Sequence, residues 1–313
     1  MAPVIQLQDL VVHLGSAPIL KGLSCELAGP TIGLLGPNGA GKSTLIRSLL
    51  GFHDAAGGTA RVLGLDPQGE ARDIRSQVGY MPEHDSFISG QTAIRFVRYM
   101  AELHGLPTPE AMERAHEALF WVGLGEARYR EVDGFSTGMK QRVKLAQAIV
   151  HSPSLVILDE PTNGLDPPGR ARMLELVKEL AATDGLTLLV SSHVMGDIET
   201  CADEVLILKE GRVARVHQLR AEREGDHRFL EIELVGDEAP FLHALNDLGL
   251  AHSRGTRQRL RVATQRDFPV AKIFQAALDA GVTVRSLVQR EDTLREVFLD
   301  AMEVDVSANG GAA

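Results

Sequence analysis

The chain has 313 residues, of which 44% are hydrophobic and 24% charged, close to the averages of soluble globular proteins; collagen-like, disordered and disulfide-scaffold classes are therefore excluded. This length exceeds what one hydrophobic core usually serves, so we expect a large domain and a smaller one. The net charge of −10 gives no global field that would attract nucleic acid, and the two cysteines, Cys25 and Cys201, form no zinc-site spacing. Two cysteines that stand far apart are typical of a reducing cytoplasm, which we expect for this chain. No stretch approaches the roughly 20 apolar residues of a membrane span, so we do not expect the chain itself to be a membrane protein.

Apolar runs alternate with helical patterns through the first two thirds of the chain. The run at residues 32–35 leads through a glycine-rich turn into a helical pattern at residues 45–50. Similar apolar runs recur at residues 155–158, 186–190 and 205–208, and a helical pattern at residues 173–180 separates two of them. This alternation predicts an α/β fold with a mostly parallel sheet covered on both faces.

Two consecutive helical patterns interrupt this alternation between residues 92 and 123, and Thr108-Pro109 begins the second of them. We therefore expect a helical insertion there. With the adjoining Phe87 and Ile88, it would offer a docking surface to a partner.

The last third predicts a separate α+β unit. After a charged connector, the pattern from residue 228 is strand, helix, two strands around Gly255, helix and strand, which is the βαββαβ order of a ferredoxin-like domain. A final amphipathic helix is expected from Thr293. Arg259 and Arg261 fall on one face of a strand, where they could contact acidic headgroups or simply guard an exposed edge.

These patterns divide the chain into four segments. They are a larger domain at residues 1–217 with a helical subdomain at about 84–150, a connector at 218–227, an accessory domain at 228–304 and a flexible tail at 305–313.

A glycine-rich phosphate-binding loop lies between the first predicted buried strand and its helix. Its residues are Gly36, Pro37, Asn38, Gly39, Ala40, Gly41, Lys42, Ser43 and Thr44. Glycines let backbone N–H groups turn toward phosphate oxygens, and the following helix N-terminus favours negative charge. We expect Lys42 to contact the outer phosphates of a nucleotide and Ser43 to bind Mg²⁺.

Two acids, Asp159 and Glu160, directly follow the apolar run at residues 155–158. Open α/β sheets bind ligands at the carboxyl ends of their strands. Mg²⁺ prefers oxygen ligands, and an attacking water needs a carboxylate to orient or deprotonate it. We therefore expect Asp159 to bind Mg²⁺ and Glu160 to act as the base.

Two further residues stand at positions where a phosphate could be reached. Ser136 is placed to cap the helix that follows it, and His193 ends the apolar run before it. Taken alone, Ser136 is also what a simple helix cap requires, and a single histidine at a strand end is more often structural.

Together these residues resemble the ATP-binding subunits of ABC transporters. Residues 135–139, with Ser136 and Gly138, resemble the signature motif of that family, and residues 163–166, ending in Asp166, resemble its D-loop. His193 resembles the switch histidine, and Glu83 stands where the family usually has the Q-loop glutamine. The resemblance covers about residues 4–217. The last unit more weakly resembles an accessory domain of the drug, lipid and polysaccharide exporters.

This resemblance implies a P-loop NTPase fold of the ABC type, which has a mostly parallel sheet, an antiparallel β portion and a helical subdomain. It implies an ATPase that uses ATP and Mg²⁺, with Glu160, His193 and Glu83 in catalysis and Ser43, Asp159 and Glu83 at the metal. It also implies a dimer, expected to be a homodimer, in which each ATP lies between the P-loop of one subunit and the signature motif of the other. The implied partner is a polytopic membrane permease at the cytoplasmic face of the cell membrane, and no nucleic acid is expected.

The sequence departs from the usual family pattern in three segments. Leu14 stands where the family stacks an aromatic ring on adenine, Thr137 and Met139 replace the commonest signature residues, and Glu83 replaces glutamine.

A soluble ABC-type ATPase acting on ribosomes or DNA is the alternative function. Such chains usually carry two cassettes or a coiled-coil insertion, whereas this sequence has one P-loop and no heptad run, which favours transport.

Overall fold

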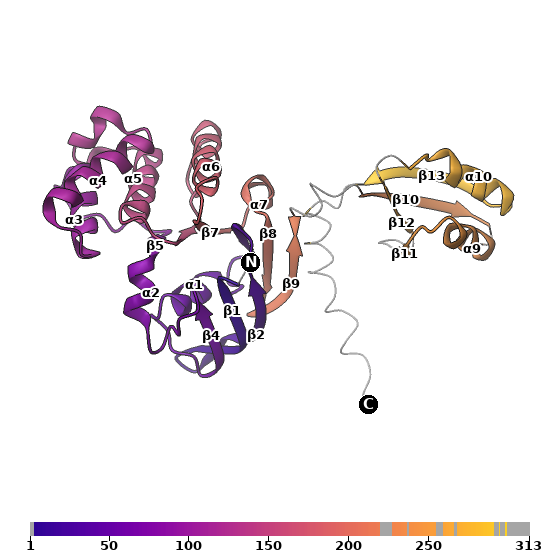
Figure 1. Cartoon of the computed structure of the whole chain (residues 1–313), viewed down its shortest axis with the longest axis horizontal. Helices are drawn as coiled ribbons and strands as arrows, with labels where there is room; N and C mark the ends of the chain where they lie inside the picture. Colours follow the sequence, from indigo (N-terminus) through magenta and orange to yellow (C-terminus); the bar gives the residue numbers. More distant parts are fainter. Residues whose placement is uncertain are drawn as a thin grey trace. The chain divides into compact units, whose positions relative to one another are not determined.

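The computed structural model describes residues 3–219, 227–236, 238–254, 259–265 and 268–290, together with Leu294 and Phe298. They form two compact units, one ending at Leu219 and one within residues 220–300 (Figure 1). Most of the predicted connector, the predicted tail at residues 305–313, and the predicted last helix apart from Leu294 and Phe298 lie outside the described residues. Within the part that is described, no helix is long and apolar enough to cross a membrane.

A six-stranded sheet forms the centre of the larger unit. Its strands are β3 (Thr31–Leu35), β5 (Val78–Met81), β6 (Leu155–Asp159), β7 (Thr187–Ser192), β8 (Glu204–Lys209) and β9 (Arg212–Gln218). Their order is β5-β6-β7-β3-β8-β9, and all pairs are parallel except β8 with β9. Every residue of β3 and β6 is buried, as expected for central strands covered on both faces. The mostly parallel sheet predicted from the apolar runs is confirmed.

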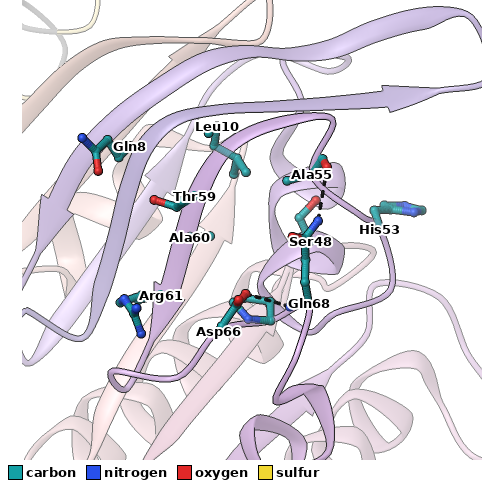
Figure 2. Close-up of a pocket in the computed structure, with 12 residues that line it drawn as sticks. Gln8, Leu10, Ser48, His53, Ala55, Thr59, Ala60, Arg61, Asp66 and Gln68 are labelled. Atoms are coloured by element: carbon teal, nitrogen blue, oxygen red, sulfur yellow. Dashed lines mark hydrogen bonds between the residues drawn. The ribbon is translucent and has the colours of Figure 1, made fainter.

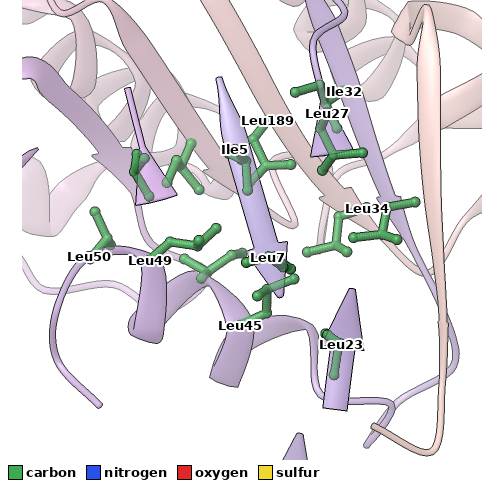
Figure 3. Close-up of a cluster of buried hydrophobic side chains, with 14 of the residues drawn as sticks. Ile5, Leu7, Leu23, Leu27, Ile32, Leu34, Leu45, Leu49, Leu50 and Leu189 are labelled. Atoms are coloured by element: carbon green, nitrogen blue, oxygen red, sulfur yellow. The ribbon is translucent and has the colours of Figure 1, made fainter. Parts of the chain in front are cut away.

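A three-stranded antiparallel sheet completes the core of this unit. It consists of β1 (Ile5–Leu14), β2 (Ala17–Leu27) and β4 (Gly57–Val62) in the order β2-β1-β4. The apolar residues of helix α1 (Lys42–Leu49) pack with those of β1, β2 and β3 in one cluster (Figure 3). Burying one leucine or isoleucine contributes about 1.5–3 kcal/mol. This cluster therefore fixes the start of α1 beside the end of β3.

Helices cover the sheet and form the predicted insertion. They are α2 (Ala71–Gln77), α3 (Ala93–Leu103), α4 (Thr108–Trp121), α5 (Thr137–Ile149), α6 (Pro167–Ala181) and α7 (Met195–Cys201), with short 3-10 turns at Gly125–Tyr129 and Val132–Gly134. Helices α3, α4 and α5 pack on one another, and α5 also packs on β5 and β6 (Figure 1). The two helices predicted between residues 92 and 123 are confirmed, and the second begins at Thr108 as expected.

The smaller unit has the predicted βαββαβ order. Its elements are β10 (His227–Val235), α9 (Ala239–Asp247), β11 (His252–Arg254), β12 (Leu260–Gln265), α10 (Ala271–Asp279) and β13 (Thr283–Arg290). The strands form an antiparallel sheet in the order β11-β12-β10-β13, and the two helices share its apolar core. Arg259, beside β12, pairs with Glu231 at 3.8 Å and Glu233 at 2.9 Å, so two carboxylates of the neighbouring strand β10 neutralise this charge.

Candidate active site

The turn between β3 and α1 is the predicted phosphate-binding loop. A Cβ at Gly36 would lie 2.5 Å from the backbone oxygen of Leu208, so no side chain fits there. Gly41 is the N-cap of α1 with a φ of 105°, a conformation that glycine adopts without strain. Among the described residues, no side chain caps the start of α1. The N–H groups of its first turn are therefore available to an anion.

The rest of the loop is arranged around that turn. Pro37, Asn38 and Gly39 are exposed, whereas the N–H of Ala40 donates to the backbone oxygen of Pro37 at 3.1 Å. Ser43 and Thr44 lie half-buried in the first turn of α1. The loop therefore presents backbone groups to solvent while Ala40 anchors it to the core.

Lys42 is the first residue of α1 and its side chain is buried. Its Nζ donates to the backbone oxygen of Gly36 at 2.7 Å and to that of Pro37 at 3.4 Å. The same nitrogen lies 3.7 Å from Oε1 of Glu160. Neutral carbonyl oxygens are weaker partners for an ammonium group than charged phosphate oxygens. Lys42 is therefore placed to exchange these partners for a phosphate.

Asp159 is a buried carboxylate at the end of β6. It accepts hydrogen bonds from Oγ of Ser191 at 2.5 Å and from the hydroxyl of Tyr80 at 3.5 Å. Burial raises the pKa of Asp159; the Ser191 bond opposes this effect, and the charge of Glu83 adds to it. Burial and the proximity of Asp159 raise the pKa of Tyr80 to about 12, so its hydroxyl remains a donor.

The chemistry of this donor set fits Mg²⁺. A cation stabilises the ionised form of a buried carboxylate that lies near a second carboxylate. Asp159, Glu83 and Ser43 would supply hard oxygen ligands, which Mg²⁺ prefers. Mg²⁺ usually keeps several waters, so three protein oxygens are an ordinary set for it.

Glu160 is held by contacts to its backbone and to both carboxylate oxygens. Its φ of 51° is unusual for a residue with a side chain, and its N–H donates to the backbone oxygen of Ser191 at 3.2 Å. Oε2 accepts a hydrogen bond from Nδ1 of His193 at 2.9 Å, while Oε1 faces Lys42. Burial raises the pKa of Glu160 above its usual value, and the hydrogen bond from His193 and the charge of Lys42 only partly oppose this rise. The result is an oriented carboxylate that is suited to accept a proton.

Glu83 follows β5 and is linked to two other functional segments. Its Oε1 accepts a hydrogen bond from Nδ2 of Asn163 at 3.2 Å. Its backbone oxygen and that of Pro82 accept from the buried Nζ of Lys144 on α5, at 2.8 and 3.1 Å. The loop of Glu83 is therefore tied both to α5 and to the segment that follows β6.

Ser136 is the N-cap of α5 and accepts a hydrogen bond from the N–H of the third helical residue at 3.3 Å, which confirms the predicted cap. A Cβ at Gly138 would lie 3.7 Å from the side chain of Leu165, so the two loops adjoin. Asp166 caps α6 through the N–H of Gly169 at 3.2 Å. Helix α5 packs mainly on β5 and its neighbouring helices, whereas α1 packs mainly on β2 and β4. The start of α5 therefore belongs to a different part of the unit from the P-loop.

Direct contacts connect Lys42, Glu160 and His193, and Glu83 is among the charges that act on Asp159. Among the described hydrogen bonds and ion pairs, none joins Ser136, Gly138 or Asp166 to these five residues. Sequence reasoning missed two residues that contact Asp159 in the site, namely Ser191 and Tyr80. Ser191 lies opposite Asp159 because β6 pairs with β7 in one parallel register, which no local sequence pattern specifies.

A separate polar pocket of about 320 Å³ lies beside the last turn of α1 (Figure 2). Ser48, Arg61, Asp66 and Gln68 are among its lining residues. Ser48 follows Lys42 by six residues, which is about 9 Å along a helix. The pocket is therefore distinct from the phosphate-binding loop.

Comparison with known proteins places this site in a family. Residues 20–163 match the ABC transporter family. The linearmycin resistance ATP-binding protein LnrL of Bacillus subtilis is 31% identical over 95% of this chain and 97% of its own length. The Nod factor export ATP-binding protein I of Rhizobium meliloti is 34% identical over 94% of this chain and 87% of its own.

A solved structure of an ATP-binding subunit of an ABC transporter also resembles the chain. The two share 29% identity with a TM-score of 0.62, over 70% of this chain and 92% of that one.

Proposed function

This chain belongs to the ATP-binding proteins of ABC transporters, and we propose that it is the ATPase of an exporter whose membrane part is a separate polytopic protein. A relative named for Nod factor export supports the direction of transport. The observation that carries the catalytic assignment is the buried carboxylate of Glu160, 2.9 Å from His193 and 3.7 Å from Lys42.

In this proposal, the loop at residues 36–44 binds the phosphates of ATP. Lys42 leaves the backbone oxygens of Gly36 and Pro37 and contacts the outer phosphates. Ser43, Asp159 and Glu83 would hold Mg²⁺, which neutralises charge on the phosphate oxygens when it is bound.

Glu160 is the proposed base. Its carboxylate accepts a proton from the attacking water, and the hydrogen bond from Nδ1 of His193 keeps it oriented. The side chain of His193 is 44% exposed, which leaves Nε2 accessible to the γ-phosphate. One histidine therefore orients the base and contacts the group that is transferred.

The nucleotide site is completed by a second copy of the chain. Ser136 and the first turn of α5 are exposed or half-exposed, and they lie on a different part of the unit from the P-loop. Free N–H groups and a hydroxyl at a helix N-terminus suit a phosphate. The resemblance supplies the arrangement: Ser136 and Gly138 of one subunit would contact the ATP held by the other, with Asp166 at the same interface.

The permease would dock on the cleft between the helical insertion and the sheet. Phe52, Met100, His104 and His151 are among the residues that line this cleft of about 120 Å³. The rings of His104 and His151 stack with centroids 3.7 Å apart, and burial, with His104 beside it, lowers the pKa of His151 to about 4. The exposed ring of Phe52, with the guanidinium of Arg75 5.4 Å from its centre, suits a partner segment that is apolar and carries an acidic group. Docking there would hold the chain at the cytoplasmic face of the cell membrane.

Affinity purification from detergent extracts tests this proposal. We expect the parental chain to recover a polytopic membrane protein. Phe52→Ser should reduce that recovery at least tenfold, whereas Leu278→Ser, at a residue 73% exposed on α10 and outside the helical insertion, should not. Equal recovery with both variants would refute the docking site. Recovery of ribosomes or DNA repair factors in place of a membrane protein would favour the alternative function.

A further inference from the structure

Asp197 is a buried carboxylate that the mechanism above does not use. It lies in the first turn of α7, four residues after His193, and only 2% of it is exposed. Oδ2 accepts a hydrogen bond from the hydroxyl of Thr162 at 2.5 Å, and Oδ1 accepts one from Nε of Arg170 at 2.7 Å. Buried carboxylates are costly unless they are paired and hydrogen-bonded, and here both oxygens have a short partner.

Both partners of Asp197 belong to the segment that carries the proposed base. Thr162 follows Glu160 by two residues. Arg170 lies in the first turn of α6, the helix that Asp166 caps. The segment that follows β6 is therefore joined to the segment that follows β7 at successive points. Glu160 meets His193, and beyond them Thr162 and Arg170 meet Asp197.

We propose that Asp197 is a positioning residue that fixes the Thr162–Arg170 segment to the helix after His193, and so holds Glu160 and His193 in register for ATP hydrolysis. This inference rests on the proposed roles of Glu160 and His193. It assigns Asp197 no contact with nucleotide or water.

The geometry explains why Asp197 should affect turnover more than nucleotide binding. The phosphate-binding loop is anchored by contacts among Gly36, Pro37 and Lys42, none of which involves Asp197. By contrast, Glu160 and His193 come from two separate loops, and their 2.9 Å hydrogen bond depends on how those loops are placed. A displacement of about 1 Å at a reacting group can cost about a hundredfold in rate.

The experiment measures kcat and ATP affinity separately in Asp197→Ala and in Thr162→Val, a milder variant that removes only one hydroxyl from the carboxylate. We expect Asp197→Ala to lower kcat at least tenfold while the Kd for ATP changes less than threefold. Thr162→Val should lower kcat in the same direction. The double variant should be no slower than Asp197→Ala alone, because both changes break one contact.

Glu175→Gln is the matched control. It breaks an arginine–carboxylate pair on the outer surface of α6, where Glu175 lies 3.0 Å from Arg172, and it should leave kcat unchanged. Activity is compared at a temperature well below the Tm of every variant. Parental kcat in both Thr162→Val and Asp197→Ala, with only the Tm lowered, would overturn the proposal. A parallel loss of ATP affinity and kcat would overturn it as well. Absence of turnover in the parental chain would refute the proposed function instead.

Discussion

Glu160→Gln is the substitution that most sharply separates chemistry from binding in this site. Glutamine keeps the shape of the side chain and one oxygen, which can still accept the hydrogen bond from Nδ1 of His193. The new amide cannot accept a proton from water. It also removes the negative charge that lies 3.7 Å from Nζ of Lys42.

The two effects have different sizes. Loss of a general base costs about 10²–10⁴ in rate, or about 3–5 kcal/mol of transition-state free energy. Two unit charges at the separation of Lys42 and Glu160 attract by about 4 kcal/mol at an effective dielectric constant near 20. Both side chains are less than 10% exposed, so the cost of removing them from water offsets much of this attraction. Freeing Lys42 should therefore tighten ATP binding by no more than about tenfold.

The assay combines phosphate release with calorimetric titration of ATP in Mg²⁺. We expect turnover to fall at least about a hundredfold, with ATP bound as tightly as by the parental chain or more tightly. Glu175→Gln makes the same chemical change on an exposed helix face and should alter neither quantity. Hydrolysis at the parental rate would show that Glu160 is not the base. Weakened ATP binding would show that its charge supports the fold of the loop.

Three further substitutions test the rest of the site. Lys42→Ala removes the charged contact to the phosphates, so calorimetry should show weaker ATP binding together with lower turnover; unchanged affinity would contradict the P-loop assignment. Leu14, 40% exposed at the end of β1, offers no ring to adenine, and Leu14→Tyr should tighten ATP binding at least about fivefold, since stacking on an aromatic ring is worth about 1–3 kcal/mol per base. His193→Ala removes a hydrogen bond that lowers the pKa of Glu160, so the pKa of Glu160 should rise further. The acid limb of the pH profile of kcat, where protonation of this carboxylate stops the reaction, should therefore move to higher pH. An unmoved acid limb would show that His193 does not act on the base.

The features that could be predicted from the sequence are those determined by neighbouring residues. Three local patterns predict a structure that the chain forms. The glycines before Lys42 precede a helix, the apolar run before Asp159 is a buried strand, and a helix begins at Thr108, just before the proline. Ser136 caps α5 because a serine before a helical pattern supplies the acceptor that the first N–H groups lack.

The features that could not be predicted depend on strand register and on long-range contacts. The Ser191–Asp159 bond joins residues 32 positions apart and exists because β6 and β7 pair in one particular register. The contacts of Asp197 likewise join loops that only the folded sheet brings together. A β-bulge can also obscure the alternation of buried and exposed residues that marks a strand. Strand β1 shifts register between Leu7 and Leu10, where Asp9 has a φ of 49°, so the burial of residues along β1 does not alternate regularly.

Phosphate release by the purified chain, measured alone and in vesicles that contain its membrane partner, tests most directly whether this protein is the ATPase of a transporter. We expect hydrolysis of ATP that requires Mg²⁺, rises when the membrane partner is present and is lost in Glu160→Gln. Absence of turnover under both conditions, or turnover that Glu160→Gln leaves unchanged, would contradict this assignment of function and site.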